Sequence, residues 1–207
     1  ALLNVKRGIS SEAVSFKPDG TCKISGKLTS NAQEILDLYS HFITRNQPVV
    51  TAHLGQSMDG FIATTNGKSH YINCHENIVH LHRMRALADA VLVGSNTVHN
   101  DNPQLTTRLV DGPNPVRVVI DPTLRLSPNH HIFAQSEAPT LVICGKGARN
   151  ENLTFSRHVE ILRLPISKEK VSPRDCCQTL ASRGLYNLLI EGGGTTVSQF
   201  VNAGTMH

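Results

Sequence analysis

The chain has 207 residues, of which 39% are hydrophobic and 4% aromatic, and a formal net charge of +4 at pH 7. This length allows one α/β domain with an aliphatic core; no apolar stretch is long enough to cross a membrane, and the small, scattered charge favours an anionic small molecule over nucleic acid. The N-terminal residues do not read as a signal peptide. The chain has five cysteines and no C-x-x-C pair, which indicates reduced thiols in a cytoplasmic protein and disfavours a zinc site.

Residues 1–47 are predicted to form an extension made of a hairpin and an amphipathic helix. Apolar segments at 13–16 and 22–24 flank Lys17-Pro18-Asp19-Gly20-Thr21, a sequence typical of a tight turn. Ser30 and Gln33 fit a capping box at the start of a helix. The apolar residues that follow at helical spacing are Ile35, Leu36, Tyr39, Phe42 and Ile43.

A second unit is expected to begin at residue 48 and to include the rest of the chain. Its first strand is the apolar run 48–54, which is followed by Gly55-Gln56-Ser57-Met58-Asp59-Gly60. Residues 76–88 predict a helix, and its apolar side carries Ile78, Val79, Leu81 and Met84. His75, His80 and His82 do not share one face of that helix, so we expect solvated or hydrogen-bonded histidines there.

The stretch 88–108 predicts a buried strand followed by a loop that holds a ligand. The apolar run 88–93 leads to Gly94, a short polar helix and Asp101-Asn102-Pro103. Pro103 fixes its own backbone and biases Asn102 away from the α-helix, so the chain must turn there and present Arg108. In α/β proteins, loops at the carboxyl ends of strands hold the ligand.

The remaining chain alternates strands and helices, which predicts a three-layer αβα fold with a mostly parallel sheet. The strands are expected at 116–120, 140–144, 159–164 and 185–190. Ser172-Pro173 predict the start of a helix that ends near Gly184. After the last strand, a glycine run precedes a helix that stops at Gly204. Because free amides and the dipole at a helix N-terminus favour an anion, this connection predicts a phosphate site.

Three segments of the second unit carry motifs. The most specific is a strand ending in G, then T-V, then D-x-P-x-L-T-x-R, and its matches are Gly94, Thr97, Val98, Asp101, Pro103, Leu105, Thr106 and Arg108. The others are G-x-S-M-D-G at 55–60 and E-x-G at 191–193. From about Val49 onward the chain resembles the reductase domain of riboflavin biosynthesis, the reductase half of the bifunctional deaminase–reductase. This resemblance implies a dihydrofolate-reductase-like fold with a mixed, mostly parallel sheet, NADPH as cofactor and a homodimer.

The resemblance also implies roles for individual residues. His53 stands where the family has lysine and is the candidate proton donor. Asp59 either orients polar groups at the site or has a structural role as a carboxylate in its turn. Lys146 and Arg149 are either contacts to a 2′-phosphate or solvated loop charges. The phosphorylated substrate would contact Ser69, Arg85, Leu105, Arg108 and Glu191. The cofactor would contact Gly55, Tyr71, Thr97, Asp101, Gly193, Gly194, Thr195, Thr196, Val197 and Ser198.

The implied reaction is the NADPH-dependent reduction of 5-amino-6-(5-phosphoribosylamino)uracil, with hydride transfer to the ribose C1. Two alternatives stay open: a reductase of the same fold acting on another pyrimidine or a pterin, and a non-catalytic relative that binds a nucleotide. The family's zinc deaminase motifs, H-x-E and P-C-x-x-C, do not occur in this sequence, so no deaminase activity is expected from it. Because family members continue past the last helix, we expect further strands beyond residue 207.

Overall fold

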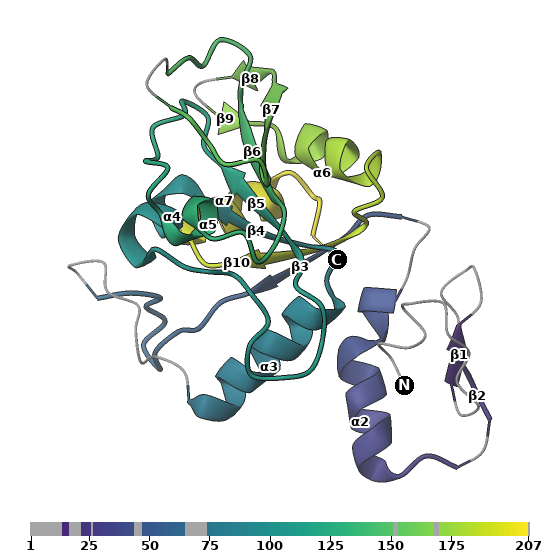
Figure 1. Ribbon diagram of the computed structural model, residues 1–207. Coiled ribbons are helices and arrows are strands. Elements are labelled where there is room, and N and C mark those ends of the chain that lie inside the picture. Colours follow the sequence, from purple (N-terminus) through teal and green to yellow (C-terminus); the bar gives the residue numbers. More distant parts are fainter. Residues whose placement is uncertain are drawn as a thin grey trace.

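The computed structural model describes residues 14–16, 22–25, 27–43, 47–64, 74–150, 153–167 and 170–206. At its centre is a six-stranded sheet in which each neighbouring pair of strands is parallel (Figure 1). The strand order is β3, β10, β4, β5, β6, β7. The strand bounds are Val49–His53 (β3), Ala90–Gly94 (β4), Val116–Ile120 (β5), Thr140–Gly145 (β6), Val159–Leu164 (β7) and Asn187–Glu191 (β10).

Helices cover both faces of the sheet and complete three layers, which confirms the predicted α/β fold. Side chains alternate along β10, so Leu188 faces one layer and Leu189 faces the other. In the first layer, Leu180 and Phe200 pack on the sheet from α6 (Pro173–Ala181) and α7 (Gly194–Asn202). The helices of the second layer are α3 (His75–Leu87), α4 (Ser95–Asp101) and α5 (His131–Ala134).

The N-terminal extension lies beside α3. Strands β1 (Val14–Phe16) and β2 (Cys22–Ile24) pair antiparallel, which confirms the predicted hairpin strands, while the turn between them lies outside the described residues. Helix α2 (Ser30–Tyr39) continues as a 3-10 turn, η1 (Ser40–Ile43). Tyr39 and Phe42 are buried with Met84 of α3, so the extension packs against the second layer (Figure 1).

Strand β10 is the last of the six strands in the sequence, yet it lies inside the sheet between β3 and β4. A carboxylate in the loop before β4 anchors the start of β10. Asp89 Oδ2 accepts the backbone N–H groups of Tyr186 at 3.0 Å and Asn187 at 2.8 Å. At the other end of β10, Glu191 is the register partner of His53. The two ends of β10 are therefore both fixed relative to its neighbours.

Two local predictions are wrong. Thr29, not Ser30, caps α2, because its Oγ1 accepts the N–H of Ala32 at 3.2 Å, and the predicted capping box does not form. Helix α3 buries His82 and Arg85, whereas Ile78, which was predicted on the apolar side, is 40% exposed. The sequence also gave no sign of α5 or of the two-residue strands β8 (Ile166–Ser167) and β9 (Lys170–Val171). No helix in the described part of the chain is both long enough and apolar enough to span a membrane.

Candidate active site

A cavity of about 370 Å³ opens at the carboxyl ends of β3 and β10. His53 and Glu191 enter it from these two strand ends. Helix α4 and the loop after it form another wall, to which Thr97 and Leu105 contribute. The cavity therefore lies where neighbouring parallel strands end, which is the usual ligand position in open α/β sheets.

A smaller hollow of about 140 Å³ adjoins the cavity, and both are lined by Asn96, Thr97 and Gly193. The hollow lies between the ends of β4 and β5 and the start of α7, and Lys170 of β9 also lines it. An elongated ligand can therefore lie with one end in the cavity and the other in the hollow.

The turn from β10 into α7 consists of glycines for a conformational and a steric reason. Gly192 and Gly193 have φ angles of 72° and 75°, which residues with a side chain rarely adopt. Gly94 faces this turn from the end of β4, and a Cβ there would lie only 2.5 Å from Thr196 Oγ1. The sequence thus keeps side chains away from the first amides of α7, where free donors and the helix dipole favour an anion. This geometry supports the predicted phosphate site.

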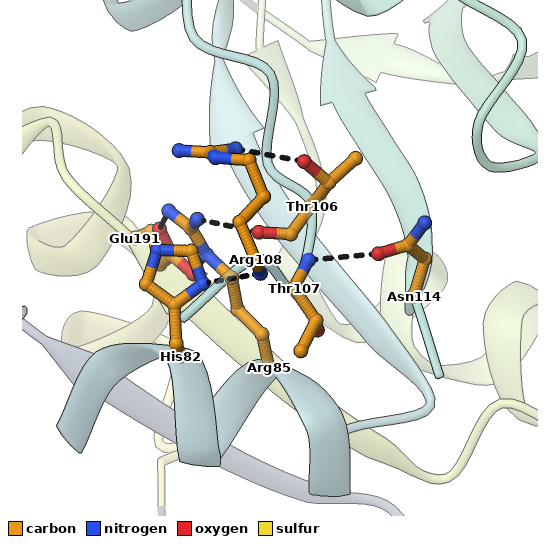
Figure 2. A network of polar contacts seen from close by, with 7 residues as sticks. All are labelled: His82, Arg85, Thr106, Thr107, Arg108, Asn114 and Glu191. Atoms are coloured by element: carbon orange, nitrogen blue, oxygen red, sulfur yellow. Dashed lines mark hydrogen bonds and ion pairs between the residues drawn. The ribbon is translucent and has the colours of Figure 1, made fainter. Parts of the chain in front are cut away.

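A buried ion pair joins α3 to β10 at the wall of the cavity (Figure 2). Arg85 Nε donates to Glu191 Oε1 at 2.7 Å, and Nη2 donates to Oε2 at 2.6 Å. Arg85 Nη1 donates to the carbonyl of Thr106 at 3.0 Å, and the arginine and the glutamate are each 7% exposed. The glutamate is therefore held in one orientation. Because Glu191 already balances the charge of Arg85, a substrate anion would have to compete with it for this arginine.

Arg108 lies close to the ion pair and is held through both its backbone and its side chain (Figure 2). Its N–H donates to His82 Nδ1 at 2.9 Å, and its Nη1 donates to Thr106 Oγ1 at 2.7 Å. Burial and the charge of Arg85 lower the pKa of Arg108, and Glu191 opposes this by raising it. The guanidinium nevertheless stays charged. Within the described residues Arg108 has no carboxylate in an ion pair, so it is the better placed of the two arginines to receive an anion.

His82 is kept neutral by its surroundings. It is 2% exposed, and burial together with Arg85 and Arg108 lowers its pKa from 6.5 to about 4. A neutral Nδ1 can accept the N–H of Arg108, whereas a protonated ring cannot. The position of the Arg108 backbone therefore depends on an unprotonated imidazole.

We expect the protein to lose stability as the pH falls from about 6.5 to about 4, because the unfolded chain protonates His82 in this window and the folded chain does not. The free energy of unfolding should therefore rise with pH across the window. His82→Asn keeps an acceptor for Arg108 and should remove about 2 kcal/mol of this dependence. Urea unfolding at about pH 4.5 and about pH 7 measures it, and equal pH slopes for both proteins would contradict the prediction.

The structure brings many of the predicted site residues together. Those that line the cavity or the hollow are His53, Gly55, Arg85, Thr97, Asp101, Leu105, Glu191, Gly193, Thr195 and Thr196. Asp59 lies in an exposed turn, where Ser57 Oγ donates to its Oδ1 at 2.5 Å. Arg108 is not among the described lining residues but lies close to Arg85, which lines the cavity, and Ser69 and Tyr71 lie outside the described residues. Three predicted cofactor contacts belong to α7 without lining either space in the described structure: Gly194, Val197 and Ser198.

Some features of the site carry no signal in the sequence. Lys170 lines the hollow from a two-residue strand, whereas Lys146 and Arg149, the predicted candidates for a cofactor phosphate, are exposed and lie outside its described lining. Leu105 is 2% exposed and has a φ of 55°, a costly conformation for leucine. Such conformations persist only where the surrounding structure enforces them, and here Leu105 forms part of the cavity wall.

The fold and site define an α/β protein whose cavity lies at the carboxyl ends of parallel strands, next to a glycine turn at a helix N-terminus, where open α/β sheets usually hold a ligand. Residues 48–207 match the family described as the RibD C-terminal domain, and the chain belongs to this family. The resemblance found in the motifs is thereby confirmed.

Relatives of the chain are named as riboflavin biosynthesis proteins or as pyrimidinone phosphate reductases. It is 32% identical over 180 residues to riboflavin biosynthesis protein RibD of Aquifex aeolicus, which covers 86% of this chain and 49% of that protein. It is 32% identical over 166 residues to a 2,5-diamino-6-ribosylamino-4(3H)-pyrimidinone 5′-phosphate reductase of Archaeoglobus fulgidus, which covers 75% of each chain. The chain thus spans about half the length of its RibD relative.

A solved structure shows the same fold. It is a diaminohydroxyphosphoribosylaminopyrimidine deaminase/5-amino-6-(5-phosphoribosylamino)uracil reductase from Thermotoga maritima, with a TM-score of 0.65 and 31% identity. The match covers 83% of this chain and 46% of that one. The chain therefore belongs to a family whose named members include oxidoreductases.

Proposed function

We propose that the chain is an NADPH-dependent reductase of riboflavin biosynthesis that acts on a phosphorylated ribosylaminopyrimidine. The observation that carries the proposal is the cavity beside the glycine turn, in a chain whose relatives are named as reductases. The hollow at the glycine turn suits a cofactor phosphate, and the adjoining cavity suits a small polar substrate.

The hollow fits the phosphate-bearing part of a dinucleotide. Side chains in place of two glycines would fill it, because a Cβ on Gly94 or Gly193 would lie 2.5 Å from Thr196 Oγ1 or 3.0 Å from Thr97 Oγ1. The amides at the start of α7 and the ammonium group of Lys170 would hold the phosphates. A bound NADPH would supply a hydride to the ribose C1 of the substrate.

His53 and Glu191 would serve the reacting end of the substrate. They are register partners, so their side chains leave the sheet on the same side and reach the same cavity. When the opened C1=N bond of the substrate receives a hydride at carbon, its nitrogen needs one proton, and His53 would donate it. Glu191, held by Arg85, would accept hydrogen bonds from substrate hydroxyl or amino groups.

Arg108→Ala should raise the KM for the phosphorylated substrate about 10- to 100-fold and change kcat by much less. The reason is that the variant removes a binding contact distant from the reacting bond. Steady-state kinetics with NADPH at saturation measure both constants. Arg174→Ala, which removes an exposed arginine of α6 on the other face of the sheet, is the matched control. An unchanged KM in Arg108→Ala would exclude the proposed anion contact.

The test of the proposal is NADPH oxidation with two substrates, run beside binding titrations of NADPH and NADH. One is 5-amino-6-(5-phosphoribosylamino)uracil. The other is 2,5-diamino-6-ribosylamino-4(3H)-pyrimidinone 5′-phosphate, included because the Archaeoglobus fulgidus relative is named for it. We expect turnover of at least one, with a ribityl product confirmed by mass spectrometry. Binding of NADPH without turnover would contradict the proposal and favour another pyrimidine, a pterin or a non-catalytic nucleotide-binding role.

The homodimer, the cytoplasmic location and the division of the chain near residue 47 stay predictions. Support for the division comes from the family match, which begins at residue 48. The structure nevertheless packs Tyr39 and Phe42 of the extension against α3, so the two parts share a buried contact.

A further inference from the structure

Three ring side chains connect the N-terminal helix to the cavity. Tyr39, at the end of α2, is 3% exposed, and its Oη lies 2.5 Å from Nδ1 of His80 on α3. The ring of His80 lies 5.8 Å from that of His53 between centroids, with 53° between their planes. His53 in turn lines the cavity. Tyr39 lies outside residues 48–207, the part of the chain that matches the family.

The contact between Tyr39 and His80 can be assigned a direction. A phenol keeps its proton at neutral pH and can donate it to an unprotonated Nδ1, and we assign this direction. The neutral imidazole of His80 then carries its own proton on Nε2. Burial, the neighbouring His53 and the charge of Arg83 lower the pKa of His80. At neutral pH the ring of His80 is therefore uncharged.

The other charged groups near the two histidines come from three elements. Arg83 and Arg85 belong to α3, Glu191 to β10 and Asp101 to α4, and all of these except Arg83 line the cavity together with His53. Arg85 and Glu191 balance each other in the buried ion pair. His80 is therefore the ring that contacts His53 from the side of α3, and it does so in its uncharged form.

We propose that Tyr39 and His80 are positioning residues for His53: Tyr39 holds His80 in one place and in one tautomer, which leaves His53 as the imidazole that brings a proton into the cavity. This inference rests on the proposed function, in which His53 protonates the substrate nitrogen. It gives the N-terminal helix a part in the site although that helix does not line the described cavity.

The first test needs no turnover and follows the imidazole signals of the full chain by NMR during a pH titration. Tyr39→Phe keeps the buried ring but removes the donor to Nδ1, so the pKa of His80 should rise by about half a pH unit. His53→Asn should also raise the pKa of His80, because it removes the neighbouring charge. Tyr186→Phe is the matched control, since it makes the same change at the amino end of β10, and it should leave the titration of His80 unchanged.

The second test measures kcat/KM with NADPH as a function of pH. In Tyr39→Phe the hydrogen bond that holds the His80 ring in one place and one tautomer is lost, so kcat/KM should fall about fivefold and its pH profile should change. In a His80→Asn background, Tyr39→Phe should have no further effect, because it acts through His80.

A lower melting temperature of Tyr39→Phe with an unchanged His80 titration and pH profile would overturn the inference, because Tyr39 would then serve packing alone. An equal effect of Tyr39→Phe with and without His80 would overturn it as well. If the wild-type protein turns over neither substrate, the proposed function fails, and the NMR titrations still decide whether the three rings are coupled.

Discussion

Arg85→Met should cost the folded state about 3 to 5 kcal/mol and abolish activity. The variant leaves the carboxylate of Glu191, which is 7% exposed, without the two guanidinium hydrogen bonds that hold it. A buried charge without a partner is among the most destabilising changes that a single substitution makes. Urea unfolding at neutral pH should show the loss as a lower midpoint with an unchanged slope.

The double variant Arg85→Met/Glu191→Met separates stability from function. Two apolar side chains of similar length remove both buried charges, so the free energy of unfolding should return to within about 1 kcal/mol of the wild type. Activity should stay absent, because the proposed substrate contact of Glu191 is lost. A single Arg85→Met variant as stable as the wild type would show that the ion pair does not hold Glu191 in place.

Gly193→Val should weaken NADPH binding at least about a hundredfold, which corresponds to about 2.7 kcal/mol. The side chain would enter the space between the cavity and the hollow, where a Cβ lies 3.0 Å from Thr97 Oγ1. It would also force a β-branched residue to a φ of 75°, at a cost of about 1 to 2 kcal/mol. Calorimetric titration with NADPH measures the affinity.

Gly184→Val is the matched control for the strain that a positive φ causes in valine. Gly184 has a φ of 79°, close to that of Gly193, but a Cβ there meets nothing within 4 Å. Both variants should lose similar stability, while only Gly193→Val should lose affinity for NADPH. Equal loss of affinity in the two would mean that backbone strain weakens binding generally, and it would remove the glycine turn from the proposed cofactor site.

The strands and the glycine turn could be predicted because their signals are local. A continuous apolar run such as 90–93 is typical of a strand covered on both faces, and β4 is buried there. The glycines before α7 predict a left-handed backbone from the sequence alone, and Gly192 and Gly193 adopt it. Signals of this kind need no knowledge of the rest of the chain.

The burial of α3 could not be predicted, because it depends on residues far away in the sequence. The buried Arg85 is paired with a glutamate that lies 106 positions later in the sequence. The buried His82 accepts a hydrogen bond from the backbone of Arg108, 26 positions later. Helical periodicity ranks polar residues as exposed, so it placed Ile78 on the apolar side and gave no sign that these two side chains are buried. For the same reason, no local pattern could assign Lys170 to the hollow or join Tyr39 to His80.

The place of β10 in the sheet has a consequence for how the protein is made. During synthesis β3 and β4 emerge long before the strand that pairs with both of them, so β4 would wait with one unpaired edge and β3 without its neighbour in the described sheet. Pairing over such a distance gives a high contact order, which slows folding and lengthens the exposure of these edges to other chains. The strand that brings Glu191 into the site is also the one that joins β3 to β4, so the proposed active site and this part of the sheet should form in the same step.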